Sequence, residues 1–167
     1  KNVKIRLFLL VLLFVSNIFA NEIDIKNLTQ EQKETLKEIK QKGDSHGLGY
    51  TLMAIAIKES QLGEYMINLD TKDFGLYQIN IKSALNRNNM KDTTWNRNVL
   101  ASKLVSDFSF ATKNAIDELA YWQKFHKNDW SKIWGSYNAG FKFNSKEARA
   151  YSKDIASIIE KLRKIDV

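Results

Sequence analysis

Apolar residues recur at helical spacing through most of the chain, and they predict a mainly α protein. In the stretch LTQEQKETLKEIKQKG, Thr29 fits a helix N-cap, Gln32 follows three residues later as in a capping box, and Gly43 fits the helix end. The next stretch, LGYTLMAIAIKES, is apolar on both of its faces. We therefore expect a buried helix that carries Glu59 near its C-terminal end.

The same spacing continues after a polar loop. One helix is expected near residues 98–106 and another near residues 110–125. The inward face of the second helix is expected to hold Ile116, Leu119, Ala120 and Trp122. The segment from Ile79 to Asn86 fits either a helix or a strand, and the pattern leaves this choice open.

Two further helices are predicted near the C-terminus. The stretch NDWSKIWGSYNAG offers Asn128 or Asp129 as the N-cap and Gly140 as the end. Its apolar stripe consists of Trp130, Ile133, Trp134 and Tyr137, and that of the last helix of Tyr151, Ile155, Ile158, Leu162 and Ile165. The pattern thus predicts a mainly α single domain of about six to seven helices, with at most a small β-hairpin before the sequence DFG.

The N-terminal residues have the order of a secretory signal peptide. A basic start, KNVKIR, precedes the apolar run LFLLVLLFV and the segment SNIFA, which ends on the small residue Ala20. We expect residues 1–20 to be a signal peptide, and residues 21–167 to form a periplasmic domain without stable membrane insertion. Retention as an anchor is the alternative, although the apolar stretch from Leu7 is shorter than the roughly 20 residues of a membrane span.

Charge and cysteine content exclude several classes of function. The formal charge is +7, and without Lys1, Lys4 and Arg6 it falls to +4, with basic and acidic residues mixed along the helices. This pattern is typical of a solvated surface, so no nucleic-acid partner is expected. The chain has no cysteine, and its two histidines, His46 and His126, are far apart. We therefore expect no disulfide, no metal and no cofactor.

Glu59 is the first candidate for chemistry. Burial disfavours its charged form, and so does the negative C-terminal end of the helix dipole. Both effects raise the pKa of a carboxyl, which is what a general acid needs near neutral pH. The alternative is an ordinary acid that reaches water or pairs with Lys58 or Lys42.

Asp73 is a second acid, 14 residues after Glu59, and it opens the stretch DFGLYQIN. Two carboxyl groups facing one cleft are the usual arrangement for cutting glycosidic bonds. The alternative is that Asp73 caps the turn before Gly75.

Four motifs, in this order along the chain, resemble those of a known protein family. They are ES at Glu59, GLYQIN from Gly75, SYNAG from Ser136, and a final helix that carries Tyr151. Together, over residues 48–159, they resemble the soluble lytic transglycosylase family, whose domain is built like goose-type lysozyme. DFGLYQIN is similar to the DYGLFQIN of small exported transglycosylases that accompany secretion, conjugation and pilus machines. It is also similar to the DYGILQIN of conventional animal lysozymes, in which the aspartate is the second carboxylate.

The resemblance implies a lysozyme-like fold and cleavage of the β-1,4 bond between N-acetylmuramic acid and N-acetylglucosamine in peptidoglycan glycan strands. Glu59 would protonate the leaving oxygen and then, as carboxylate, take a proton from the muramic C6 hydroxyl, which closes a 1,6-anhydro ring. Asp73 is a candidate stabiliser of the positive charge at the sugar. The expected protein is a monomer, with a secretion or conjugation complex of the cell envelope as a candidate partner.

The resemblance also implies supporting residues around the acid. Ser60 would orient the site through its hydroxyl, or would simply end the helix. Gly75 would let the backbone pass close to the sugar, or would only form a turn. Gln78 would bind sugar hydroxyl and acetamido groups. Tyr77 replaces the more usual methionine or phenylalanine and is expected to alter one sugar subsite.

Three more positions come from the last two motifs. Asn138 is expected to meet the cleft from the side opposite Glu59. Tyr137 and Tyr151 would support the acid, and packing on their apolar stripes is the alternative for both. Two other functions stay open: a hydrolysing lysozyme that uses Asp73 and water, and an inactive wall-binding assembly protein that kept the fold.

Overall fold

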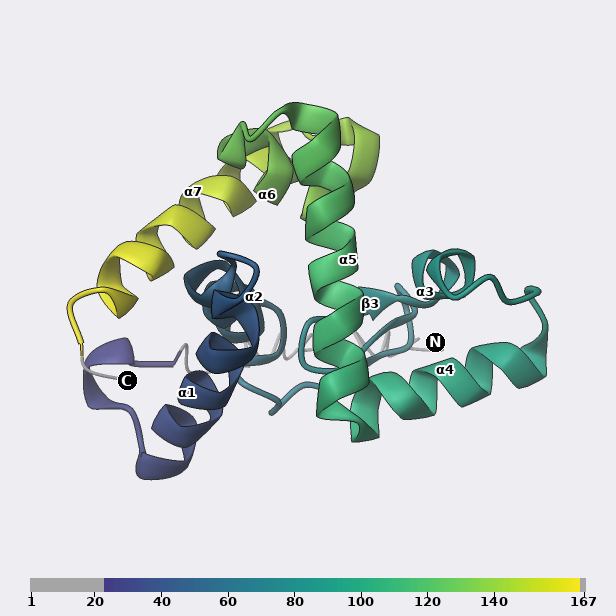
Figure 1. Ribbon diagram of the computed structural model, residues 1–167, viewed down its shortest axis with the longest axis horizontal. Coiled ribbons are helices and arrows are strands. Elements are labelled where there is room, and N and C mark those ends of the chain that lie inside the picture. Colours follow the sequence, from purple (N-terminus) through teal and green to yellow (C-terminus); the bar gives the residue numbers. More distant parts are fainter. Residues whose placement is uncertain (1–22, 166–167) are drawn as a thin grey trace, which may run out of the picture.

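The computed structural model describes residues 23–165, and over that range the mainly α prediction is confirmed (Figure 1). The α-helices are α1 (Gln30–Asp44), α2 (Gly49–Ser60), α3 (Ile81–Arg87), α4 (Thr94–Ser106), α5 (Phe108–His126), α6 (Trp130–Ala139) and α7 (Lys146–Leu162). Two 3-10 helices, η1 (Ile25–Asn27) and η2 (Gly140–Lys142), accompany them. The expected signal peptide lies outside the described residues. Between residues 23 and 165, no helix has the length and apolarity that a membrane crossing requires.

A small antiparallel sheet takes the place of the expected hairpin. Its strands are β1 (Ile67–Asn68), β2 (Asp73–Phe74) and β3 (Ile79–Asn80), in the order β1-β2-β3. Asp73 pairs with Asn80 across β2 and β3.

The segment that fitted either a helix or a strand contains both. β3 ends at Asn80, and α3 begins at the next residue. The Asn80 side chain accepts a hydrogen bond from the Lys82 backbone nitrogen at 3.1 Å and so caps the new helix. Because the chain changes from strand to helix after two extended residues, neither the strand period nor the helix period dominates the sequence pattern here.

The predicted helix caps are largely confirmed. The Thr29 hydroxyl accepts from the Gln32 nitrogen, and the Gln32 side chain accepts from the Thr29 nitrogen, which completes the capping box. Asp129 is the N-cap of α6, and Gly140, with φ +58°, ends that helix. Other boundaries differ slightly: α4 begins at Thr94, and α7 ends at Leu162, so Ile165 lies beyond the helix.

One predicted core residue is wrong. Ala120 is exposed, whereas Ala115, Leu119 and Trp122 are buried on α5. These three residues are spaced i, i+4 and i+7 and define one face; Ala120 is rotated by about 100° from Leu119 and by more from the other two.

The core surrounds α2. Every residue from Leu52 to Ile57 is buried on this helix, as its apolar composition predicted. α2 packs on α1 and α7, and α6 packs on α5 and α7. In Figure 1, α1, α2 and α7 lie on one side of the long α5, with α3 and α4 on the other. This arrangement holds the C-terminal end of α2, and thus Glu59, at a junction between the two sides.

Candidate active site

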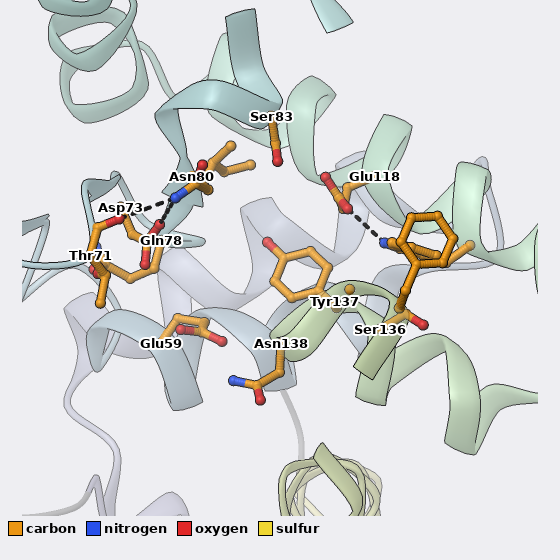
Figure 2. Close-up of a pocket in the computed structure, with 14 residues that line it drawn as sticks. Glu59, Thr71, Asp73, Gln78, Asn80, Ser83, Glu118, Ser136, Tyr137 and Asn138 are labelled. Atoms are coloured by element: carbon orange, nitrogen blue, oxygen red, sulfur yellow. Dashed lines mark hydrogen bonds between the residues drawn. The ribbon is translucent and has the colours of Figure 1, made fainter. Parts of the chain in front are cut away.

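A cavity of about 550 Å³ opens beside Glu59 (Figure 2). Its wall is formed by the sheet and its connections, by helices α3, α5 and α6, and by η2. Its lining residues are Glu59, Thr71, Asp73, Gln78, Ile79, Asn80, Ser83, Glu118, Trp122, Ser136, Tyr137, Asn138, Gly140 and Phe141. Of the residues expected from the sequence, Glu59, Asp73, Gln78, Tyr137 and Asn138 are brought together here, while Ser60, Gly75 and Tyr151 lie behind the wall.

Glu59 is a largely buried acid with one hydroxyl donor. The pKa of its carboxyl is raised from 4.5 to about 7, mainly by burial and also by the negative charge of Asp73. The Tyr151 hydroxyl opposes this rise by donating a hydrogen bond to Glu59 Oε1 at 2.5 Å. Lys58 also lowers the pKa, but it bonds Asp154 on α7 at 2.7 Å instead of forming an ion pair with Glu59. A substantial fraction of Glu59 is therefore protonated near neutral pH.

The two expected tyrosines are hydrogen-bond donors in the structure. Tyr151 is buried on α7, and burial and the charge of Glu59 raise its pKa well above the usual value. The pKa of Tyr137 is raised for the same reasons, and its hydroxyl donates to the Tyr77 carbonyl oxygen at 2.9 Å. Tyr151 thus contacts the acid directly, whereas Tyr137 connects α6 to the turn between β2 and β3.

Asp73 is held by the strand opposite. Asn80 Nδ2 donates to Asp73 Oδ1 at 2.9 Å and to the Thr71 carbonyl oxygen at 3.1 Å (Figure 2). Asp73 and Glu59 both line the cavity, so two carboxyl groups share it.

Gln78 lines the cavity in a left-handed backbone conformation, with φ +45°. Its Nε2 donates to the carbonyl oxygens of Tyr65, at 3.1 Å, and Gly75, at 3.0 Å. Both bonds fix the side chain against its own loop. The amide oxygen has no hydrogen-bond donor within residues 23–165 and is the part of Gln78 left for a ligand.

Ser60 is fully buried and does not line the cavity. Its hydroxyl donates to the Leu76 carbonyl oxygen at 2.7 Å and accepts from the Gly63 nitrogen at 3.0 Å. It therefore joins the end of α2 to the turn between β2 and β3, which fixes Glu59 relative to Gln78.

Gly75 has a different reason for being glycine than the expected approach to the sugar. Its φ is +83°, and a Cβ atom built there would lie 2.1 Å from the Leu104 carbonyl oxygen on α4. Gly75 does not line the cavity. The close approach is to α4, and the absence of a side chain lets the turn pack against that helix.

We expect Gly75→Ala to lower the free energy of unfolding by at least about 2 kcal/mol, because the added methyl clashes with backbone and the φ angle is unfavourable. Gly47→Ala is the matched control: φ is +67° there, but nothing lies within 4 Å of the added Cβ. Chemical denaturation measures both. Equal losses for the two variants would contradict the packing explanation.

Tyr77 corrects another expectation. Its side chain is fully buried, with its hydroxyl 3.0 Å from the Thr112 hydroxyl on α5, and it does not line the cavity. The bulkier residue therefore fills the core and changes no sugar subsite.

Sequence reasoning missed Glu118. It lies on α5, lines the cavity, accepts from Trp122 Nε1 at 2.6 Å and forms an ion pair with Arg87 of α3. Glu59 was singled out because it is an acid among the apolar positions of a helix. Glu118 also lies among apolar positions, on α5, so the same criterion could have found it. Thr71, Ser83 and Phe141 are also new to the site, and their loop and short-helix positions gave no comparable pattern.

Neither histidine lies in a group that could hold a metal. His46 is exposed after α1, and His126 lies 2.8 Å from the Ser136 hydroxyl within an aromatic cluster. Within residues 23–165, no set of three or more histidine, aspartate or glutamate side chains is arranged to hold a metal ion.

Residues 37–159 match the transglycosylase SLT domain family, and the chain belongs to that family. Membership indicates lytic transglycosylase activity on peptidoglycan, so the cavity beside Glu59 is the candidate active site. No curated protein and no solved structure matches the chain significantly.

Proposed function

We propose that this protein is a periplasmic lytic transglycosylase that cleaves the β-1,4 bond between N-acetylmuramic acid and N-acetylglucosamine and leaves a 1,6-anhydro end. The observation that carries the proposal is the environment of Glu59: a carboxyl whose pKa is raised to about 7, at the wall of a cavity large enough for sugars. Family membership supports the same substrate class.

In the proposed reaction, protonated Glu59 donates to the bridging oxygen as the glycosidic bond breaks. The bonding electrons leave with that oxygen, and positive charge develops at the muramic C1 carbon. Glu59, now a carboxylate, takes the proton of the muramic C6 hydroxyl, whose oxygen forms the new bond to C1. The acid is thereby restored and no water is consumed.

The surrounding residues have supporting roles in this proposal. The Tyr151 hydroxyl fixes Glu59 Oε1 and stabilises the carboxylate that forms after proton transfer. Gln78 and Asn138 bind sugar substituents, and Ser60 and Gly75 fix the backbone behind them. Asp73 contributes negative charge near the developing cation.

A hydrolysing lysozyme is the second candidate, and the position of Asp73 favours it as an alternative. Asp73 lines the same cavity as Glu59 and raises its pKa, as a second carboxylate would. In that reaction water replaces the C6 hydroxyl, and the product is a reducing sugar. The intact acid in its cavity argues against an inactive wall-binding protein.

Mass spectrometry of the muropeptides released from purified peptidoglycan tests the proposal. We expect 1,6-anhydro ends, which are lighter by one water than hydrolytic ends. We also expect Asp73→Asn to retain much of the turnover, since one acid is enough for the proposed reaction. Reducing ends from the wild type, with a collapse of several hundredfold in Asp73→Asn, on the scale of a lost charge-stabilising group, would instead establish the lysozyme mechanism.

The proposed location and partner rest on the sequence. The N-terminal pattern supports export, and the similarity of DFGLYQIN to the motif of secretion-associated transglycosylases supports local wall opening for a secretion or conjugation apparatus.

A further inference from the structure

Two neighbouring contacts join the C-terminal end of α2 to α7. The Tyr151 hydroxyl donates to Glu59 Oε1 at 2.5 Å. The Lys58 ammonium, from the residue just before Glu59, donates to Asp154 Oδ2 at 2.7 Å. Tyr151 and Asp154 are three residues apart on α7 and therefore share one side of that helix. One side of α7 thus holds both the candidate acid and the cation next to it.

Lys58 differs in charge from the other groups around Glu59. The titratable side chains that act on the Glu59 carboxyl or line its cavity are Lys58 on α2, Asp73 on β2, Glu118 on α5, Tyr137 on α6 and Tyr151 on α7. Both tyrosines stay neutral, because burial and the charge of Glu59 raise their pKa values well above the usual value. Within this set Lys58 is the only cation, and its charge lowers the pKa of Glu59 even while it is paired with Asp154.

The position of the Lys58 ammonium matters for the proposed reaction. A positive charge within about 4–6 Å of a carboxyl favours the ionised form. A free Lys58 ammonium would be drawn toward Glu59, since a lysine side chain is long and flexible. Glu59 would then hold its proton less tightly, and as a carboxylate it would be a weaker base toward the muramic C6 hydroxyl. The Asp154 carboxylate neutralises that ammonium and holds it at α7.

We propose that Asp154 is a positioning residue: it holds the Lys58 ammonium at α7 and so leaves Glu59 with the proton that the reaction requires. Asp154 is 51% exposed and does not line the catalytic cavity, so it acts on the acid through Lys58. An exposed ion pair contributes little to stability, so removing it should leave the fold intact. This inference rests on the proposed role of Glu59 as general acid.

A carbon-13 NMR titration of glutamate-labelled protein tests the proposal without substrate, with the Glu59 resonance identified by its absence from Glu59→Gln. Asp154→Asn should lower the midpoint of the Glu59 titration by about 0.5 to 1 pH unit. The expected change lies below the roughly one to three pH units that a charge in direct contact produces, because Lys58 remains partly hydrated. An unchanged midpoint would contradict the role given to Asp154.

A second variant shows whether Lys58 carries the effect. Lys58→Met removes the cation, so the Glu59 midpoint should not fall below that of the wild type. Asp154→Asn in the Lys58→Met background should then change nothing further. If Asp154→Asn lowers the midpoint by the same amount in both backgrounds, the charge of Asp154 acts on Glu59 directly and the positioning role is wrong.

The pH dependence of turnover distinguishes positioning from a structural role. Asp154→Asn should match the wild-type kcat/KM at about pH 5, where Glu59 is protonated in both proteins. At about pH 8 the variant should be about three- to tenfold slower, because less of its Glu59 is protonated there. A structural loss would instead lower kcat/KM at both pH values, and that result would overturn the proposal.

Glu160→Gln is the matched control. Glu160 is an exposed carboxylate on the same helix and pairs with Lys164 at 2.8 Å, but it lies about 14 Å beyond Tyr151 along α7. This variant should leave the midpoint unchanged, and a change equal to that in Asp154→Asn would show a general effect of charge and overturn the positioning role. The proposed function fails separately. If the midpoints move as expected while the wild type cleaves no strand, Asp154 still positions Lys58, but the enzyme assignment is wrong.

Discussion

Glu59→Gln should reduce turnover of peptidoglycan by about 10²- to 10⁴-fold, the contribution that a positioned general acid makes to catalysis. Glutamine has nearly the same shape and can still accept the Tyr151 hydrogen bond, but it has no proton of suitable pKa to donate. Release of soluble muropeptides measures the loss. Near wild-type release by this variant would show that another group is the acid.

The same substitution should stabilise the fold at alkaline pH, which excludes misfolding as the cause of lost turnover. The pKa of Glu59 is raised from 4.5 to about 7, so the folded state holds the proton more tightly than the unfolded chain. This tighter proton binding stabilises the folded state; its contribution to the free energy of unfolding is fully present below pH 4.5 and is lost as the pH rises through 7. Glutamine avoids that loss, and at pH 8 the variant should gain as much as about 3 kcal/mol.

Turnover by the wild type should fall above pH 7, by about tenfold for each further pH unit, because only protonated Glu59 donates. Tyr151→Phe removes the hydrogen bond that lowers the pKa of Glu59, so the alkaline fall should move to higher pH. The pH profile of kcat/KM measures this shift. The rate of the variant should also drop, since the carboxylate formed after proton transfer loses a donor. A fall at unchanged pH in the variant would contradict the role given to Tyr151.

Most of the fold could be predicted from local patterns in the sequence. The capping box at Thr29 and the all-apolar stretch of α2 depend on neighbours within a few residues, so their physical cause is visible in the chain itself. The raised pKa of Glu59 follows from the same local fact, since a carboxyl at the end of a buried helix has little water around it.

Contacts between segments that are far apart in the sequence could not be predicted from such local patterns. Gly75 is constrained by Leu104, and Glu118 is paired with Arg87, 31 residues away. Tyr77 is buried in the core, where its hydroxyl lies 3.0 Å from that of Thr112 on α5, 35 residues away. Periodicity reports which face of an element is apolar, but it does not report which other element covers that face.

The most direct test of the central claim is the pKa of the Glu59 carboxyl itself. A carbon-13 NMR titration of glutamate-labelled protein, with the Glu59→Gln spectrum identifying the resonance, gives this value without substrate. We predict a midpoint near pH 7, from burial and the charge of Asp73 acting against the Tyr151 hydrogen bond. A midpoint at the ordinary value of about 4.5 would mean that Glu59 is ionised at neutral pH and cannot be the proton donor.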